Sequence, residues 1–165
     1  MFSEPSLSRA AALIAACRRA AFFLATAESC TGGLLAALIT AIPGSSDVFE
    51  RGFVTYSNAA KIESLGVELR ILEQFGAVSS ETAREMAIGA LLHSKANIAL
   101  SITGIAGPGG GTPEKPLGLV HFGVAKREGA IITIEKRFGD LGRDAVRFAA
   151  VVMAVELLSD AVQGA

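Results

Sequence analysis

The chain has 165 residues, of which 51% are hydrophobic and 19% charged, and its formal net charge is -1. This composition is too apolar for a disordered chain, and so small a net charge gives no general attraction to nucleic acid or to anionic lipid. The length fits one domain and no stretch has the composition of a linker, so we expect residues 1–165 to form a single globular domain.

The apolar content does not predict a membrane protein, because every apolar run is broken well short of the ~20 residues that a spanning helix needs. Glu4 and three arginines interrupt the N-terminal stretch where a signal peptide would lie. Two cysteines, Cys17 and Cys30, form neither a disulfide framework nor a metal-ligand spacing. We therefore expect a cytoplasmic protein with reduced thiols and no bound metal.

In chain order, hydrophobic spacing and residue propensity predict alternating helices and strands. The predicted elements are a helix over 7–19, a strand over 22–27, a helix over 34–40, a strand over 48–56, a helix over 59–65 capped by Ser57-Asn58, a helix over 80–93, strands over 98–103, 117–126 and 130–137, and a helix over 143–162. The last two strands form a hairpin around Glu128-Gly129. This order predicts an α/β fold, a three-layer α/β/α sandwich with a mixed sheet.

Three polar, glycine-containing segments each follow a predicted strand, at residues 28–33, 56–61 and 103–112. In open α/β sheets, ligands bind outside the carboxyl ends of the strands. We therefore expect the three segments to converge into one pocket.

Ser29 is the candidate nucleophile, because it lies at a strand-to-helix junction beside Gly32 and Gly33. Free N–H groups at the start of the following helix could hold a developing oxyanion or a phosphate. The alternative is that Ser29 or Thr31 is an ordinary helix N-cap. Cys30 is a rival nucleophile, although a buried packing role is commoner for such a cysteine.

A serine nucleophile needs a base, and the candidate here is Lys61, which follows the strand that ends near Tyr56. Lysine can replace histidine as the base if burial or a neighbouring cation lowers its pKa. The alternative is a solvated lysine on a helix. Neither histidine is the expected base, because His93 is expected to be solvated and His121 to be packed within a strand. The Tyr56 hydroxyl could relay a proton, orient a ligand or simply lie at the surface.

The loop over residues 104–111 is rich in glycine and suits the approach of a phosphate or ribose. It is neither a Walker A motif nor a dinucleotide-binding motif in its required context, which disfavours nucleoside triphosphate and hydride-transfer chemistry. Arg143 and Arg147 lie near the start of the last helix, where they either bind an anion or pair with Asp140 or Asp144.

Taken in this order, four sequence motifs resemble the C-terminal domain of the CinA family from about residue 7 onward. The motifs are Ala27-Glu28-Ser29-Cys30-Thr31-Gly32-Gly33, Tyr56-Ser57-Asn58-Ala59-Ala60-Lys61 with Leu65-Gly66-Val67, Val78-Ser79 with Glu81, and Thr103-Gly104-Ile105-Ala106-Gly107-Pro108-Gly109-Gly110 with Lys115-Pro116. Stand-alone members of this family include nicotinamide-nucleotide amidases, so the resemblance implies hydrolysis of nicotinamide mononucleotide to nicotinic acid mononucleotide and ammonia, without a cofactor.

The resemblance also implies which residues serve the reaction. Ser29, Tyr56 and Lys61 are the implied catalytic group. The expected substrate-binding residues are Glu28, Cys30, Thr31, Gly32, Gly33, Ser57, Asn58, Thr103, Gly104, Ala106, Gly107, Gly110, Gly111 and Arg143.

Two other functions remain open from the sequence. The chain could be a module that binds a pyridine nucleotide and turns nothing over. It could also be an interaction domain, because Val151, Val152, Val155 and Leu158 make the last helix apolar over a wide arc. Whichever function holds, we expect a homo-oligomer, with a dimer favoured.

Overall fold

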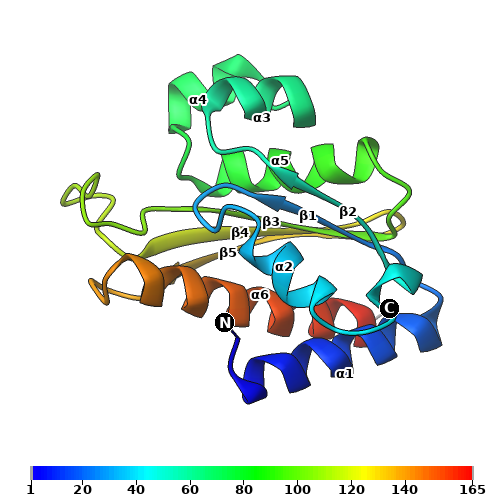
Figure 1. The fold of residues 1–165 in the computed structure, drawn as a ribbon. Coiled ribbons are helices and arrows are strands. Elements are labelled where there is room, and N and C mark those ends of the chain that lie inside the picture. Colours follow the sequence, from blue (N-terminus) through cyan, green and yellow to red (C-terminus); the bar gives the residue numbers. More distant parts are fainter. Residues whose placement is uncertain (1, 165) are drawn as a thin grey trace.

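The computed structural model describes residues 2–164 as one five-stranded sheet with helices on both faces (Figure 1). The strands are β1 (Leu24–Glu28), β2 (Phe49–Val54), β3 (Ile98–Gly104), β4 (Leu119–Lys126) and β5 (Ile131–Arg137). The helices of these residues are α1 (Glu4–Ala20), α2 (Leu34–Thr40), α3 (Asn58–Leu65), α4 (Leu69–Phe75), α5 (Ser80–Leu92) and α6 (Arg143–Gln163), with a short 3-10 turn at Ser45–Asp47.

The sheet is mixed, as predicted, with the strand order β2-β1-β3-β4-β5. β1 pairs in parallel with both β2 and β3, whereas β4 is antiparallel to β3 and β5 is antiparallel to β4. Glu28, the last residue of β1, lies opposite Val54 and Ile102. The carboxyl ends of β1, β2 and β3 therefore meet at one edge, where the three polar segments begin.

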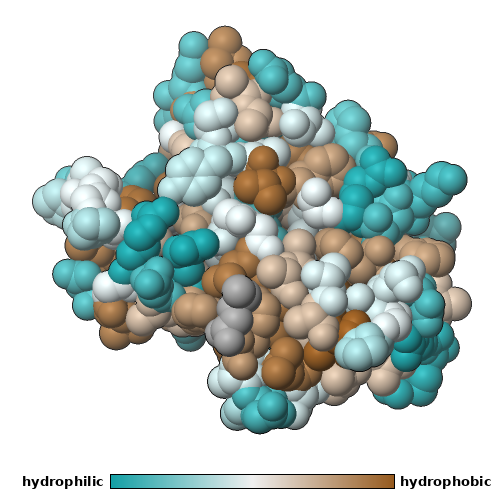
Figure 2. Space-filling view, viewed as in Figure 1, coloured by the Kyte–Doolittle hydropathy of each residue, from teal (hydrophilic) through white to brown (hydrophobic). Residues whose placement is uncertain are grey.

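Two apolar cores separate three layers, and this confirms the α/β/α sandwich. One core joins α1, α2 and α6 to one face of the sheet, and the other joins α3, α4 and α5 to the opposite face. Figure 1 shows α5 lying directly on the sheet with α3 and α4 beyond it. On the face drawn in Figure 2, hydrophobic residues reach the surface in patches over the layer of α1, α2 and α6.

Helix α4 was not predicted from the sequence, and several predicted elements have different bounds in the structure. Helix α4 has seven residues, and its N-cap residue Glu68 makes no side-chain capping bond, so its local signal is weak. Helix α1 begins earlier than expected, because Ser3 caps it and Pro5 lies in its first turn. The β1 strand also continues one residue further than predicted and includes Glu28.

The arc of α6 that suggested an interaction surface is mostly core. Val151, Val155 and Leu158 are buried against the sheet and the neighbouring helices, and only Val152 is partly exposed. That reading of the arc is wrong, because helix α6 lies between α1 and the sheet and so buries a wide stripe of its surface. Within residues 2–164, no helix is both long enough and apolar enough to span a membrane.

Candidate active site

Lys61 and Ser29 meet inside the protein at the carboxyl end of β1. Ser57 caps α3 by accepting a hydrogen bond from the Ala60 N–H at 3.0 Å, which starts the helix in a defined orientation. Lys61 therefore faces the sheet, where its Nζ lies 3.0 Å from Ser29 Oγ and donates to the Thr55 carbonyl at 2.8 Å. We call Ser29 and Lys61 the Ser-Lys pair.

The Lys61 side chain is only 1% exposed, so it is not the solvated lysine that was the alternative. Burial lowers the pKa of its amine, because the charged form loses its hydration. No carboxylate among residues 2–164 forms an ion pair with Lys61 to oppose this shift. The neutral form of this amine is therefore more accessible than that of a solvated lysine.

The turn after β1 shows that Ser29 is not a helix cap. Gly33 is the N-cap residue of α2, and it provides no side-chain capping bond. Gly32 and Gly33 have φ of 59° and 94°, a left-handed conformation that glycine adopts without strain. Ser29 precedes this turn with its N–H donated to the Ile102 carbonyl, so the N-cap interpretation of Ser29 is wrong.

Glu28 supplies the missing cap from within the strand. Its fully buried carboxylate accepts hydrogen bonds from the N–H groups of Gly33, Leu35 and Ala36 at 3.1, 3.0 and 2.9 Å. The negative charge also suits the positive N-terminal end of α2. Glu28 therefore builds the turn, and its carboxylate oxygens are already engaged with the protein where the sequence predicted a substrate contact.

This turn limits which N–H groups can face a substrate. Gly33 donates to Glu28 and Gly32 donates to the Ser29 carbonyl at 3.1 Å. Among the hydrogen bonds of residues 2–164, none uses the N–H of Cys30 or Thr31. The N–H groups of Gly32 and Gly33 are therefore engaged within the turn, whereas those of Cys30 and Thr31 are left for a ligand.

The Cys30 thiol is a poor rival nucleophile. It is buried, and burial raises its pKa to about 11, so the reactive thiolate is scarce near neutral pH. The structure assigns this residue to packing against the core of the α1, α2 and α6 layer.

Arg143 joins two of the three polar segments through its side chain. It donates from Nη1 to the Gly107 carbonyl and from Nη2 to the Tyr56 hydroxyl, each at 2.8 Å. Tyr56 is 60% exposed, and within residues 2–164 its hydroxyl has no hydrogen bond to Ser29 or Lys61. Arg143 thus pairs with neither Asp140 nor Asp144 in this structure.

Arg147 lies one turn further along α6, behind the nucleophile turn. Its Nη2 donates to the Thr31 carbonyl at 3.0 Å, while Nη1 is 3.7 Å from Asp144 Oδ1. Its Nε is buried without a hydrogen-bond partner among residues 2–164. The pairing with Asp144 that the sequence suggested is present at this arginine, and the contact with Thr31 ties α6 to the turn.

The glycine-rich loop is the third of the polar segments. The Ile105 N–H donates to the carbonyl of Leu119, the first residue of β4, and the Ile105 carbonyl accepts from the N–H of Gly118 just before that strand. These two hydrogen bonds anchor the loop at its base. Between Ala106 and Gly111, no N–H group makes a hydrogen bond within residues 2–164. Free backbone donors at the site edge suit an anionic or hydroxyl-rich ligand.

Comparison with known proteins identifies the family of this chain. The model of the CinA C-terminal domain family matches residues 7–162. The chain belongs to the CinA C-terminal domain family. A curated relative from Enterobacter agglomerans, named nicotinamide-nucleotide amidohydrolase PncC, is 52% identical over 143 residues, which cover 86% of this chain and 86% of the relative. The protein of the same name from Escherichia coli (strain K12) is 55% identical over 134 residues and covers 81% of this chain and 80% of its own length.

Other members of the CinA family are longer. This chain is 55% identical over 115 residues to a putative competence-damage inducible protein of Caldicellulosiruptor bescii, of which it spans 28%. Among solved structures, the competence/damage inducible protein CihA from Agrobacterium tumefaciens has a TM-score of 0.95 and 48% identity, with 99% of this chain and 98% of that chain covered. The three-layer sandwich is therefore the fold of the CinA family.

Some predicted substrate residues serve the scaffold in this structure. Thr103 is buried and donates from its hydroxyl to the Ala77 carbonyl at 2.6 Å, so it holds the segment before α5. Gly104 ends β3 where a Cβ would meet the Leu119 carbonyl at 2.7 Å. Ser57 is used as the cap of α3, and Asn58 is the first residue of that helix rather than part of its cap.

Neither histidine lies in hydrogen-bonding distance of Ser29. His93 Nδ1 is 2.9 Å from the Gly89 carbonyl, and His121 Nδ1 is 3.3 Å from Ser80 Oγ. Burial lowers the pKa of His121, which is packed in β4 as the sequence suggested. No group of three or more His, Cys, Asp or Glu side chains able to hold a metal ion was found in the described part of the chain.

Sequence reasoning missed Thr55 as a functional residue. Its carbonyl oxygen accepts from Lys61 and orients the amine towards Ser29. Because this contact uses a backbone atom, the type of the side chain carries no signal of it. The only signal in the sequence is the position of Thr55, directly before Tyr56 at the end of a predicted strand.

Proposed function

We propose that this member of the CinA family is a nicotinamide-nucleotide amidohydrolase that converts nicotinamide mononucleotide to nicotinic acid mononucleotide and ammonia. The names of relatives that are 52% and 55% identical support the reaction. The observation that carries the mechanism is the buried Lys61 Nζ at 3.0 Å from Ser29 Oγ. An activated serine near a carboxamide is equipped for acyl transfer.

In the first step, neutral Lys61 accepts the hydroxyl proton of Ser29. One N–H of the amine donates to the Thr55 carbonyl, which leaves the nitrogen lone pair free to point at Ser29. The Ser29 oxygen then forms a bond to the carboxamide carbon of the substrate. The N–H groups of Cys30 and Thr31 stabilise the negative charge that develops on the carboxamide oxygen.

In the second step, Lys61 returns its proton to the amide nitrogen, the carbon–nitrogen bond breaks and ammonia leaves. An ester to Ser29 remains. Water then attacks this ester while Lys61 accepts one of its protons, and the proton passes to the Ser29 oxygen as the nicotinate carboxylate is released. The Ser-Lys pair carries the proton that moves to the leaving ammonia and the proton that moves from water to Ser29, and the carboxylic acid product loses its own proton to solvent.

The ribose phosphate part of the substrate is assigned to the mouth of the site. Arg143 uses two of its five N–H donors on Gly107 and Tyr56, which leaves donors for a phosphate oxygen. The unpaired N–H groups between Ala106 and Gly111 add neutral donors next to it. Tyr56, with its ring exposed and its hydroxyl on Arg143, orients the substrate and does not take part in the proton transfer.

The reaction is proposed to take place in the cytoplasm, and within one domain formed by residues 1–165. No spanning helix is found in residues 2–164, and elements from α1 to α6 share the cores that hold the site.

Ammonia release from nicotinamide mononucleotide tests the proposed function directly. The wild type should release ammonia with and without a chelator, Cys30→Ala should keep this activity, and Ser29→Ala should lose it. Binding of the mononucleotide without ammonia release would instead identify a non-catalytic nucleotide-binding module. Retained activity in Ser29→Ala would move the nucleophile to another residue.

A further inference from the structure

Strand β5 forms an open edge of the sheet. It is the outermost strand next to β4, and within residues 2–164 no other strand pairs with its far side. Such an edge presents unpaired N–H and C=O groups that can accept another strand. Its first four residues are Ile131-Ile132-Thr133-Ile134, an apolar and β-branched run, and Ile132 is 50% exposed.

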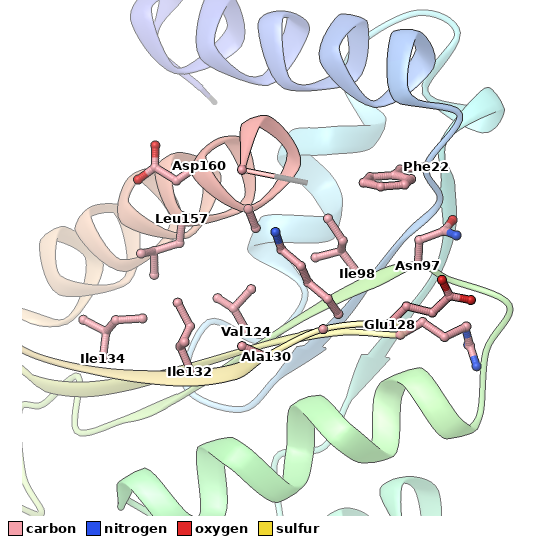
Figure 3. Close-up of a pocket in the computed structure, with 15 residues that line it drawn as sticks. Phe22, Asn97, Ile98, Val124, Glu128, Ala130, Ile132, Ile134, Leu157 and Asp160 are labelled. Carbon is pink, nitrogen blue, oxygen red and sulfur yellow. The ribbon is translucent and has the colours of Figure 1, made fainter.

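The side of helix α6 next to β5 is also uncovered. Two hollows lie along it, one of about 800 Å³ and one of about 670 Å³. Figure 3 shows the larger one, in which Ile132, Ile134 and Val124 rise from the strands towards Leu157 of α6. The smaller hollow is lined in part by Phe138, Phe148 and Val152. We call the edge of β5 together with these two hollows the β5 flank.

We propose that a second copy of this chain covers the β5 flank, and that the two copies pair β5 against β5 in antiparallel fashion about a two-fold axis. The two sheets then become one ten-stranded sheet. An axis perpendicular to the sheet keeps each α6 on the same face, so one α6 lies on either side of the joined β5 strands.

The charges of β5 select one register. Ile134 is the midpoint of Ile131–Arg137, so an axis at Ile134 pairs the whole strand and sets each Ile132 opposite the partner subunit's Lys136. An axis at Glu135 or at Lys136 would place like charges directly opposite one another, which is destabilising. An axis at Thr133 would leave the last two residues of each strand without a partner.

The charges around the hollows are complementary in this register. Asp160 lines the same hollow as Ile132, and none of the ion pairs within residues 2–164 involves Asp160 or Lys136. Glu156, which lines the smaller hollow together with Lys136, is already paired with Arg9 at 2.6 Å. Pairing across the axis brings the partner subunit's Lys136 to the hollow that holds Asp160, so each free charge acquires a partner.

Solution mass tests the assembly. Sedimentation equilibrium of the wild type should give twice the 17.0 kDa of the chain. Ile132→Lys adds a charge at an exposed position near the centre of the interface and should raise the dimer dissociation constant at least about tenfold. Leu69→Lys is the matched control, because Leu69 is 57% exposed but lies on α4 in the opposite layer, and it should leave the mass unchanged. A monomeric wild type, or a dimer that Ile132→Lys does not weaken, overturns the proposal.

Cross-linking tests the register by a gain of signal. Ile134→Cys should form a disulfide-linked dimer under mild oxidation, since both native cysteines are buried and the two introduced thiols face each other at the axis. Thr133→Cys should cross-link far less, because its opposite residue is the partner subunit's Glu135. A cross-link from Thr133→Cys but not from Ile134→Cys overturns the proposed register, and a cross-link from neither overturns the β5 pairing.

Discussion

Lys61 Nζ lies 3.0 Å from Ser29 Oγ, although the two residues are 32 positions apart in the chain. The contact depends on three local structures: the end of β1, the turn closed by Glu28 and the cap of α3 by Ser57. Each of them sets the direction of one side chain. Together they place an amine of lowered pKa beside a serine hydroxyl, and this arrangement can be tested one part at a time.

The role of Lys61 as a base predicts that a fixed positive charge cannot replace it. Arginine keeps the charge but does not give up its proton in the accessible pH range. Lys61→Arg should therefore be nearly as inactive as Lys61→Met, with a turnover rate ~10²- to 10⁴-fold below the wild type. Steady-state ammonia release at saturating mononucleotide measures this. Substantial turnover by Lys61→Arg would assign Lys61 to charge balance instead.

The lowered pKa of Lys61 also predicts a pH-dependent cost in stability. Between that lowered pKa and the ordinary value of 10.5, the unfolded chain binds more protons than the folded one, so the free energy of unfolding rises with pH. Lys61→Met lacks this titration. The free energy of unfolding of Lys61→Met should exceed that of the wild type by the largest amount at lower pH. This difference should shrink as the pH approaches 10.5. Urea unfolding of both proteins over this range checks the sign, and a gain that is constant with pH would contradict the assigned shift.

Glu28 is predicted to act as a positioning residue for the nucleophile turn. The wild-type carboxylate accepts three hydrogen bonds from N–H groups, and a hydrogen bond to a charged group is worth about 1.5 to 3 kcal/mol. In Glu28→Gln the charge is lost, and the NH₂ of the new amide faces N–H donors with which it forms no hydrogen bond. The turnover rate should fall by about tenfold or more while KM changes little, because the phosphate contacts lie elsewhere. Glu68→Gln is the control for the change in charge, because Glu68 is an exposed carboxylate that pairs with Arg70. An effect of Glu28→Gln on KM alone would indicate direct substrate contact.

Arg143 is predicted to recognise the substrate phosphate. Arg143→Ala should weaken binding of nicotinamide mononucleotide at least about tenfold, as expected for one charge-assisted hydrogen bond, and should affect the dephosphorylated riboside less. Competition binding of the two compounds to the wild type and the variant measures the difference. Equal losses for both would mean that Arg143 serves only to hold Tyr56 and Gly107.

The position of Tyr56 predicts that its hydroxyl contributes less to the turnover rate than a member of the catalytic group would. Tyr56→Phe removes the hydroxyl that bonds to Arg143 and leaves the Ser-Lys pair untouched. We expect it to raise KM and to lower the turnover rate much less than Lys61→Met does. A loss in turnover rate as large as that of Lys61→Met would return the Tyr56 hydroxyl to the proton transfer.

The elements could be predicted from sequence because their signals are local. Helix α2 spans Leu34–Thr40 as expected, since a run of helix-forming apolar residues is bounded by Gly33 and by the break at Pro43-Gly44. The mixed sheet followed from strands separated by helices and one late hairpin. The convergence of three polar segments followed from the rule that parallel strands end at a common edge. Helix α4 was missed because seven residues without a side-chain cap leave little local pattern.

The chemistry of the site was decided by tertiary structure. The same sequence was compatible with a solvated Lys61, and only burial beneath α3 lowers the pKa of its amine. Glu28 looked like a ligand contact until the fold brought the N–H groups of α2 onto its carboxylate. Tyr56 looked like a partner of Lys61 until Arg143, 87 positions away in the chain, was found on its hydroxyl. Propensity and spacing act over a few residues, whereas desolvation and hydrogen-bond partners depend on which distant segments pack together.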